Sequence, residues 1–544
     1  MPVDLDSLID RLTAGAQQWA AWSYDQRATL LRATHRTIAH HAKDWVVAAV
    51  SAKGGPDRWL VGEEWLSGPY PVLESITGLA DSLDALARNT SPAAALRAGR
   101  APGNRVTLQV LPTNPKENVL LGGYRAQVWL RPGVELTQAL AGAGLGAQRP
   151  SVGGGVAVVL GAGNVSAIGP LDVLSQLVAD NRASVLKVNP TFDRLVSVYQ
   201  RALAPLIEAD LLEIMSGDAE LGERLVHHRQ VAHVHLTGSR RTHDAIVWGT
   251  HRRRHTTGVP AITASVTSEL GGVSPCIVVP GLWSRAQLRW QAEQVVTQRL
   301  NNAGHNCIGT QVMILSSDWA QRREFLDAIR EVLAGLPHRK PWYPGGAASL
   351  AHLARRHPHA EQHAGCYLIE VDPRRSDDLF DSEFFGPALA HTSLPGTGSA
   401  YLRNAVAFAN DRLDGTLGAG IIASPQSRKA MGPGFAEVIA ELRYGAIGIN
   451  VWAGFIFDLA GAPWGGFPGG TLTEPSSGVG VVHNAYLLSE TERTVAEGPF
   501  RPFPRPPWFV TARNTAATGE RMTQFATNPT WGRLLRVVPA ALRG

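Results

Sequence analysis

Apolar and polar positions follow two different periods along the chain, and the change between them predicts the fold. In residues 18–50 apolar side chains recur at steps of three and four, which indicates helices over the first ~55 residues. Residues 91–116 are rich in Pro, Gly, Asn and Thr and predict a long, irregular connection. From residue 154 onward, short β-branched runs alternate with segments of helical periodicity.

The first alternation predicts strands in GGVAVVLGAG, SVLKVNP and VAHVHLTGS, with helices in PLDVLSQLVADN and VYQRALAPLIEADLLEIMSG. The second begins near residue 273 with the strand SPCIVV, continues with a helix that Ser284 caps and that runs to about Leu300, and ends with the strand TQVMILS. Apolar strands that alternate with helices form parallel sheets covered on both faces. The pattern therefore predicts an α/β protein of the nucleotide-binding type.

Composition and charge narrow the class of partner. The chain has 544 residues, of which 44% are hydrophobic and 18% charged, so it is long enough for several globular domains. Its net charge of +5 is mild for this length and favours anionic small molecules over nucleic acid. The densest basic segment, Gly238–His255, lacks the interleaved aromatic residues that stack on bases. This segment is either a solvated helix face or a contact surface. The possible contacts are a dinucleotide phosphate, coenzyme A and a neighbouring subunit.

Compartment follows from cysteine usage and from the first residues. Cys276, Cys307 and Cys366 cannot all pair, which favours a reducing environment. The acidic start MPVDLDSLID lacks the features of a signal peptide. The uncharged residues 151–171 contain six glycines and a central asparagine, so we interpret them as buried strand and turn, not as a membrane span. We expect a soluble, cytoplasmic protein.

Three residues are candidates for chemistry. Cys307 lies in the Gly/Asn-rich turn of NNAGHNCIGTQ, between the predicted helix and the next strand, where backbone N–H groups could stabilise a thiolate or an oxyanion. Glu269 precedes two glycines in SELGG and is a candidate general base. Asn164 follows a strand in VAVVLGAGN, at the strand end where ligands bind in α/β sheets. Packing or surface roles are the alternative for each.

Two histidines raise the question of a metal. His233 and His235 share one face of a predicted strand and could bind zinc. No cysteine or acid close to them in the sequence completes a ligand set, so we predict no metal site.

Taken together and in order, the motifs resemble the aldehyde dehydrogenase superfamily over roughly residues 10–490. NNAGHNC is similar to the family's nucleophile motif and SELGG, 38 positions upstream, to its general-base motif. The resemblance implies that Cys307 is the nucleophile, Glu269 the base and Asn164 an oxyanion donor. LKVNP, LTGS, SELGG and SEFFGP are similar to the family's cofactor segments, and INVWAG with APWGGFPGG to its closing run with Asn450, Gly465 and Gly466. The cofactor residues implied in this way are Lys187, Gly238, Ser239, Leu270, Gly271, Glu383 and Phe385.

The implied activity is oxidation of an aldehyde to the acid with NAD or NADP, through a thioester on Cys307 that Glu269-activated water hydrolyses. Fifteen tryptophans and the absence of an obvious polar specificity cluster suggest an apolar aldehyde. Family members that make acyl-CoA commonly lack the glutamate, so its presence favours hydrolysis. Two alternatives remain: a CoA-acylating enzyme, favoured by the basic segment, and a catalytically impaired nucleotide-binding or scaffold relative.

The second alternative is motivated by departures from the family pattern. His305 replaces a glutamine, Ala162 and Gly163 replace a Pro-Trp pair, and His243 replaces a glycine. Pro190 stands where NAD-preferring members often have a glutamate, so the carboxylate that would repel the 2′-phosphate of NADP is absent.

The resemblance also implies domains: a NAD(P)-binding domain in residues 1–127 and 150–272, a catalytic domain in 273–475, and a β-arm for oligomerisation in 128–149 and 476–495. The two domains are expected to be Rossmann-like, and the arm to pair subunits in a homodimer or homotetramer. Residues 496–544, rich in Pro and Arg, form a tail outside the resemblance. We expect this tail to pack on a neighbouring subunit as an extended strap, with a weak membrane contact as the alternative.

Overall fold

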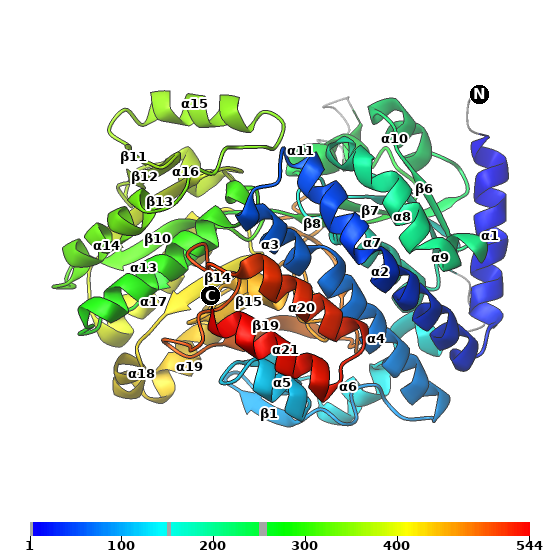
Figure 1. Ribbon diagram of the computed structural model, residues 1–544, viewed down its shortest axis with the longest axis horizontal. Coiled ribbons are helices and arrows are strands. Elements are labelled where there is room, and N and C mark those ends of the chain that lie inside the picture. Colours follow the sequence, from blue (N-terminus) through cyan, green and yellow to red (C-terminus); the bar gives the residue numbers. More distant parts are fainter. Residues whose placement is uncertain (1–3, 150–153, 250–257, 544) are drawn as a thin grey trace.

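A computed structural model describes residues 4–149, 154–249 and 258–543. Within them, most strands belong to two sheets, one of six strands and one of eleven, and helices pack against both (Figure 1). The α/β class with two Rossmann-like parallel sheets is confirmed.

The six-stranded sheet has the order β17-β8-β7-β4-β5-β6. Strands β4 to β8 are parallel, and β17 pairs antiparallel with β8 at one edge. The strand order reverses beside β4, which comes first in sequence among the strands of this sheet, and ligands bind at such points in open α/β sheets. The strands are β4 (Val156–Leu160), β5 (Ala183–Lys187), β6 (Leu212–Met215), β7 (Val231–Gly238), β8 (Ser265–Leu270) and β17 (Gly478–Val479).

The eleven-stranded sheet has the order β1-β2-β3-β19-β15-β14-β9-β10-β13-β12-β11. Its seven middle strands, from β19 to β12, are parallel, and the strands at both ends are antiparallel. The strands are β1 (Ala98–Ala101), β2 (Arg105–Leu111), β3 (Arg125–Leu130), β9 (Ser274–Val278), β10 (Thr310–Ser316), β11 (Glu361–His363), β12 (Cys366–Glu370), β13 (Ala388–Leu394), β14 (Gly418–Ile422), β15 (Ala446–Ile449) and β19 (Thr491–Glu497). A separate two-stranded pair is formed by β16 (Pro463–Trp464) and β18 (Val482–His483).

Helices bury the apolar faces of both sheets. One core joins the N-terminal helices to the six-stranded sheet, and three more lie against the eleven-stranded sheet. The helices before residue 250 are α1 (Leu5–Ala21), α2 (Tyr24–Ala52), α3 (Arg58–Ser67), α4 (Pro69–Ala87), α5 (Pro115–Leu120), α6 (Leu136–Gly142), α7 (Ile168–Asp180), α8 (Val196–Ala202), α9 (Ala204–Glu208), α10 (Ala219–Val226) and α11 (Arg240–Trp248). Those after residue 257 are α13 (Arg285–Leu300), α14 (Arg322–Ala334), α15 (Gly346–Arg356), α16 (Asp378–Asp381), α17 (Gly398–Arg412), α18 (Pro425–Met431), α19 (Pro433–Glu441), α20 (Thr515–Thr527) and α21 (Trp531–Leu542).

Two local predictions were wrong. Residues 91–116 are not irregular throughout, because they contain β1 and β2, which pair antiparallel at the end of the larger sheet. The helix predicted through LLEIM stops earlier, and Leu212–Met215 form β6. Pairing with β5 gives this segment a place in the sheet that overrides the helical preference of Leu, Glu and Met. The helix that Ser284 caps is present, with Ser284 and Gln287 forming a capping box.

The C-terminal tail folds back onto its own chain. Its helix α20 packs on α3 and α4, which come from the first 90 residues (Figure 1, red beside blue). Helices α3 and α20 approach closely because each has a glycine at the contact. A Cβ on Gly62 would lie 2.4 Å from Thr515, and one on Gly519 would lie 2.8 Å from Trp65. The tail is thus part of the fold of this chain. The prediction of an extended strap is wrong for most of residues 515–542, which form α20 and α21, and contact with a neighbouring subunit stays a prediction. Among the described helices, none combines the length and the apolar character needed to cross a membrane.

Candidate functional site

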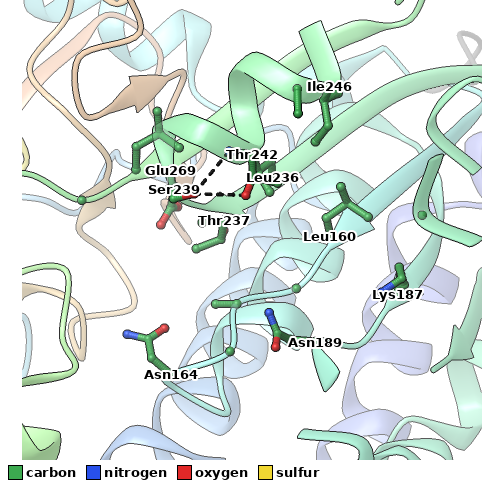
Figure 2. Close-up of a pocket in the computed structure, with 18 of the residues that line it drawn as sticks. Leu160, Asn164, Lys187, Asn189, Leu236, Thr237, Ser239, Thr242, Ile246 and Glu269 are labelled. Carbon is green, nitrogen blue, oxygen red and sulfur yellow. Dashed lines mark hydrogen bonds between the residues drawn. The ribbon is translucent and has the colours of Figure 1, made fainter. Parts of the chain in front are cut away.

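A cavity of about 690 Å³ lies where the two sheets approach each other. Its walls on one side come from the carboxyl ends of β4, β5, β7 and β8 and from the segments that follow them (Figure 2). Its remaining walls include Cys307, Tyr343, Glu383, Phe385 and Leu417. All ten catalytic and cofactor residues predicted from the sequence line this one cavity: Cys307, Glu269, Asn164, Lys187, Gly238, Ser239, Leu270, Gly271, Glu383 and Phe385.

The parallel sheet explains why residues so far apart in sequence meet. Lys187 ends β5, Gly238 ends β7, and Glu269 with Leu270 end β8, so their side chains or backbones reach the same sheet edge. Ser239 is the N-cap of α11, and its hydroxyl accepts a hydrogen bond from the Thr242 N–H at 3.2 Å. The N-terminus of α11 therefore faces the cavity, where backbone N–H groups and the helix dipole favour an anion.

Residues 301–309, which we call the Cys307 turn, connect α13 to β10 in an unusual conformation. Asn302, Ala303 and Gly304 all have positive φ, at +55°, +54° and +80°. A Cβ on Gly304 would lie 2.5 Å from the backbone of Gly386, so the turn touches the segment that carries Glu383 and Phe385. Left-handed residues other than glycine cost about 1–2 kcal/mol each, and such strain gathers at functional sites.

The thiol of Cys307 is held in its protonated form by its surroundings. Burial raises its pKa, and the carboxylates of Glu383 and Glu269 raise it further. The backbone N–H groups of Cys307 and Ile308 donate toward the sulfur and lower the pKa in part. Because only the thiolate is a good nucleophile, positive charge in the cavity or a base beside the thiol would activate it.

Asn164 lies directly beside the Cys307 turn. Its side-chain amide donates to the carbonyl of His305 at 3.2 Å, and its backbone carbonyl accepts from Asn302 at 2.9 Å. Asn302 also donates to the His305 carbonyl at 2.8 Å. The two asparagines thus fix the turn, and the Asn164 amide faces the cavity with one further N–H to offer.

Glu269 is 5% exposed, and among the described residues its Oε1 has no hydrogen-bond partner. Burial raises the pKa of this carboxyl well above its usual value, the nearby Asp172 raises it further, and a hydrogen bond from Trp464 lowers it in part. A raised pKa brings a carboxyl group closer to the range in which it can exchange protons at neutral pH, which is the property of a general base.

Glu383 folds against Gly271. A Cβ at position 271 would lie 2.2 Å from both carboxylate oxygens of Glu383, so only glycine leaves room for them. Burial raises the pKa of Glu383 to about 8, while the guanidinium of Arg299 lowers it. Its Oε1 has no hydrogen-bond partner among the residues that the structure describes. A buried carboxyl group of this kind is ready to accept a hydrogen bond from a bound ligand.

His305, which departs from the family pattern, connects two segments of the site. Its ring is fully buried, Nδ1 lies 3.1 Å from the Phe385 carbonyl, and it packs against the rings of Trp342, Tyr343 and Phe385. Burial lowers its pKa to about 4, so the ring is neutral at pH 7 and donates to this carbonyl. It links the Cys307 turn to the Glu383 segment.

The other departures also fit around the cavity. His243 is fully buried, contacts the Leu472 carbonyl at 3.1 Å, and is not among the described residues that line the cavity. Gly163 and Pro190 both line it. In the basic segment, Arg240 lies 3.7 Å from Asp414, and residues 250–255 lie outside the described residues.

Four charged residues outside the sequence motifs form buried ion pairs beside Asn302 of the Cys307 turn. Lys53 forms a 2.5 Å ion pair with Glu64 and donates to Asn302 at 2.8 Å. Glu63 accepts from the Asn302 N–H at 2.8 Å and pairs with Arg339 at 2.5 Å. All four are buried. Two acids within the apolar stretch WLVGEEWL are the only sequence signal for them, since buried acids need partners.

We expect Lys53→Met to lower the free energy of unfolding by about 3 kcal/mol, because it leaves the buried Glu64 carboxylate with only the Ser166 hydroxyl. The measurement is urea unfolding of the single variant, of Glu64→Gln and of the double variant. The double variant should regain most of the loss, since a neutral pair replaces a lone charge. A double variant less stable than either single one would contradict this explanation.

The fold also brings acids to the histidines of β7. His235, Asp172 and Glu269 are buried, and one possible ligand atom from each lies within 4.8 Å of the others. These acids could not be placed beside His235 from the sequence pattern, because Asp172 comes from α7 and Glu269 from β8.

Comparisons with known proteins agree with this geometry. The model of the aldehyde dehydrogenase family matches residues 173–355. A 3,6-anhydro-L-galactose dehydrogenase, solved in complex with NAP, is 18% identical with a TM-score of 0.60, and the match covers 91% of both chains. AldH of Staphylococcus aureus, in its substrate-bound state, is 15% identical with a TM-score of 0.59, over 93% of this chain and 96% of that one. The γ-glutamyl-γ-aminobutyraldehyde dehydrogenase of Burkholderia cenocepacia is 16% identical with a TM-score of 0.59, over 91% and 88%.

A search of curated protein sequences finds no match. The solved structures share the fold over more than nine-tenths of the chain. The family model matches the segment from α7 to α15, which contains Lys187, Glu269 and Cys307. Residues 173–355 of this chain are therefore similar to the aldehyde dehydrogenase family, and the chain has the fold of the solved aldehyde dehydrogenases.

Proposed function

We propose that this protein oxidises an aldehyde to the carboxylic acid with NAD or NADP, and that Cys307, Glu269 and Asn164 carry out the reaction. The observation that carries the proposal is that these three side chains line one cavity together with the strand ends of a nucleotide-binding sheet. A thiol, a buried base and an amide donor are the groups that acyl chemistry on a cysteine requires.

Each of the three has a distinct task. The Cys307 sulfur attacks the aldehyde carbon, and the negative charge that develops on the oxygen is stabilised by the Asn164 amide and the Cys307 backbone N–H. Oxidation of this adduct leaves a thioester on Cys307. Glu269 then removes a proton from water, whose oxygen attacks the thioester carbon and releases the acid and the thiolate.

The residues of the cavity fit a dinucleotide. Two glycines keep side chains out of the part of the cavity where a dinucleotide would lie. A Cβ on Gly163 would lie 2.7 Å from Asn189, and one on Gly271 would overlap Glu383. Lys187, the α11 N-terminus at Gly238 and Ser239, and the Glu383 carboxyl would hold the ribose and phosphate groups. When bound, NAD or NADP supplies the hydride acceptor and a positively charged ring beside the thiol.

Glu269 favours water over coenzyme A as the group that releases the acyl product. A coenzyme A thiol ionises near pH 8.5 and needs little help to attack a thioester, whereas water, with a pKa of about 15.7, needs a base. We therefore propose hydrolysis.

The surroundings of the thiol support an apolar aldehyde. Cys307 packs against an apolar cluster that includes Ile308, Leu417 and Trp452. For the assembly we propose a homodimer or homotetramer paired through residues 128–149 and 476–495, which hold parts of β3 and β19 at the antiparallel end of the larger sheet.

The test is turnover of a panel of aldehydes by the purified protein with NAD⁺ and with NADP⁺, followed by the absorbance of the reduced cofactor and by identification of the product. We expect apolar aldehydes to give the free acid, at a rate that added coenzyme A does not change. An acyl-CoA product would favour the acylating alternative. The absence of turnover with every aldehyde and both cofactors would overturn the proposal.

A further inference from the structure

A row of polar side chains runs along one face of β7 and β8 and ends at Glu269. The two strands are parallel, and their register places His233 opposite Ser265, His235 opposite Thr267, and Thr237 opposite Glu269. Since side chains alternate between the faces of a strand, all six lie on the same face. Of the residues between them, Val234, Leu236 and Val266 are buried and apolar, and Ser268 is buried.

Short contacts connect the members of this row, which we call the β7–β8 polar row. His233 Nδ1 lies 2.8 Å from Ser265 Oγ, and its Nε2 lies 2.8 Å from Thr267 Oγ1. The same Thr267 oxygen lies 2.8 Å from Nδ1 of His235. The Thr267 hydroxyl has one proton, so it donates to one imidazole and accepts from the other.

The inner end of the row reaches Glu269 through α7. His235 Nε2 lies 3.5 Å from the Asp172 carboxylate, which also accepts a hydrogen bond from Thr237 at 3.0 Å. Ligand atoms of His235, Asp172 and Glu269 lie within 4.8 Å of one another. Figure 2 shows Thr237 and Glu269 at the ends of their neighbouring strands, beside the cavity. The outer end is Ser265, which is exposed.

Burying this row of polar side chains costs free energy, which would be avoided if the row served only to pack the sheet. His233, His235 and Asp172 are 2%, 1% and 0% exposed, and apolar side chains would fill the same sheet face without the cost of removing polar groups from water. Burial lowers the pKa of His233 to about 3, with Arg182 and His235 lowering it further, so this ring is neutral at pH 7 and can accept a proton at one nitrogen while it donates from the other. The other titratable groups that interact with the row are Asp180 and His483, which act on His235, and Arg182, which acts on His233.

We propose that the β7–β8 polar row carries the proton that Glu269 removes from water to the solvent at Ser265. This inference rests on the proposed function of Glu269 as the base. Without such an outlet, Glu269 would stay protonated after one hydrolysis until the proton left through the cavity.

The transfer balances one proton in against one proton out. The carboxylates of Glu269 and Asp172 lie within 4.8 Å of each other, a gap that one water can bridge, so the proton of Glu269 passes through that water to Asp172 and on to Nε2 of His235. The Nδ1 proton of His235 moves to Thr267. The hydroxyl proton of Thr267 moves to Nε2 of His233, the Nδ1 proton of that ring moves to Ser265, and Ser265 releases its own proton to water. Each imidazole ends protonated on its other nitrogen, and before the next turnover the hydroxyls of Thr267 and Ser265 rotate and each ring returns to its starting tautomer by proton exchange with water.

The test uses an activated ester, 4-nitrophenyl acetate, which acylates a thiol without any hydride transfer, in the presence of NAD⁺, whose positively charged ring would activate Cys307. A burst of nitrophenolate reports acylation of Cys307, and the steady rate that follows reports hydrolysis of the acyl-enzyme. We expect Thr267→Val, which has the same shape without the hydroxyl, to keep the burst and to lower the steady rate about tenfold. Thr267→Ser should restore the rate, and so should added imidazole, which can enter the cavity and take the proton from Glu269.

The control is Ser268→Ala, on the opposite face of the same strand, which should behave as the wild type. A Thr267→Val steady rate equal to the wild-type rate, or a loss that neither serine nor imidazole repairs, would overturn the inference. In the wild type itself, the steady rate in mixtures of H₂O and D₂O should curve with the deuterium fraction, because several protons move, and a straight line would contradict the row even if Thr267→Val did not fold. No burst in the wild type would count against the proposed function of Cys307 itself.

Discussion

Cys307→Ser is expected to lower aldehyde turnover by at least ~10⁴-fold while leaving the melting temperature nearly unchanged. A serine hydroxyl fits the space of the thiol but is a far weaker nucleophile, and removal of a nucleophile from a catalytic group of this type costs factors of this size. The measurement is cofactor reduction with the best aldehyde of the panel, alongside thermal unfolding.

The matched control for this variant is Cys366→Ser. Cys366 is a buried thiol of β12, 1% exposed, and does not line the cavity. It should keep turnover close to that of the wild type, so the comparison separates loss of the nucleophile from loss of a buried sulfur. Equal turnover in Cys307→Ser and the wild type would remove the thiol from the mechanism.

Glu269→Gln should leave the first turnover fast and slow the following ones by 10²–10⁴-fold, the usual contribution of a general base. Glutamine keeps the size of the side chain but cannot take a proton from water, so the thioester accumulates. Rapid mixing with aldehyde and cofactor should show a burst of reduced cofactor equal to the amount of enzyme. A burst followed by wild-type steady turnover would show that another group activates the water.

The same variant has a signature in its pH dependence. Burial and Asp172 raise the pKa of Glu269 well above its ordinary value of 4.5, so the carboxylate that acts as base is lost as the pH falls through this raised pKa. The wild-type rate of hydrolysis should therefore decline on the acidic side well above pH 4.5, and Glu269→Gln should lack this decline. Stopped-flow rates between pH 5 and 9 would show it.

The sequence predicts the sheets and the cavity residues well because both depend on local patterns. Buried parallel strands are apolar runs between helices, and residues at their carboxyl ends meet whatever the rest of the chain does. Residues 98–111 were missed because their Pro and Gly content outweighed the alternation in RVTLQVL, which became visible only through pairing with β3.

What surrounds the catalytic groups could not be predicted in the same way. Lys53 and Glu63 form hydrogen bonds with Asn302 across 249 and 239 positions of sequence, and no local pattern indicates partners so far apart. Asp172 of α7 contacts His235 of β7, although neither residue differs in its local sequence from other side chains of a helix or a strand. Burial of a charge can be suspected from an apolar neighbourhood, but its partner is chosen by tertiary structure.

The contact between α3 and α20 can form only late in synthesis, because its two helices are made at opposite ends of the chain. The helix that carries Glu63 and Glu64 leaves the ribosome early, but its hydrogen bond from Thr523 to the Trp65 carbonyl spans 458 positions. At roughly 5–20 residues per second, the nascent helix waits tens of seconds for Arg339 and Asn302, and longer for α20. Chains cut short before residue 515 would leave the ribosome with this helix face uncovered, and are expected to be clients of chaperones and proteases.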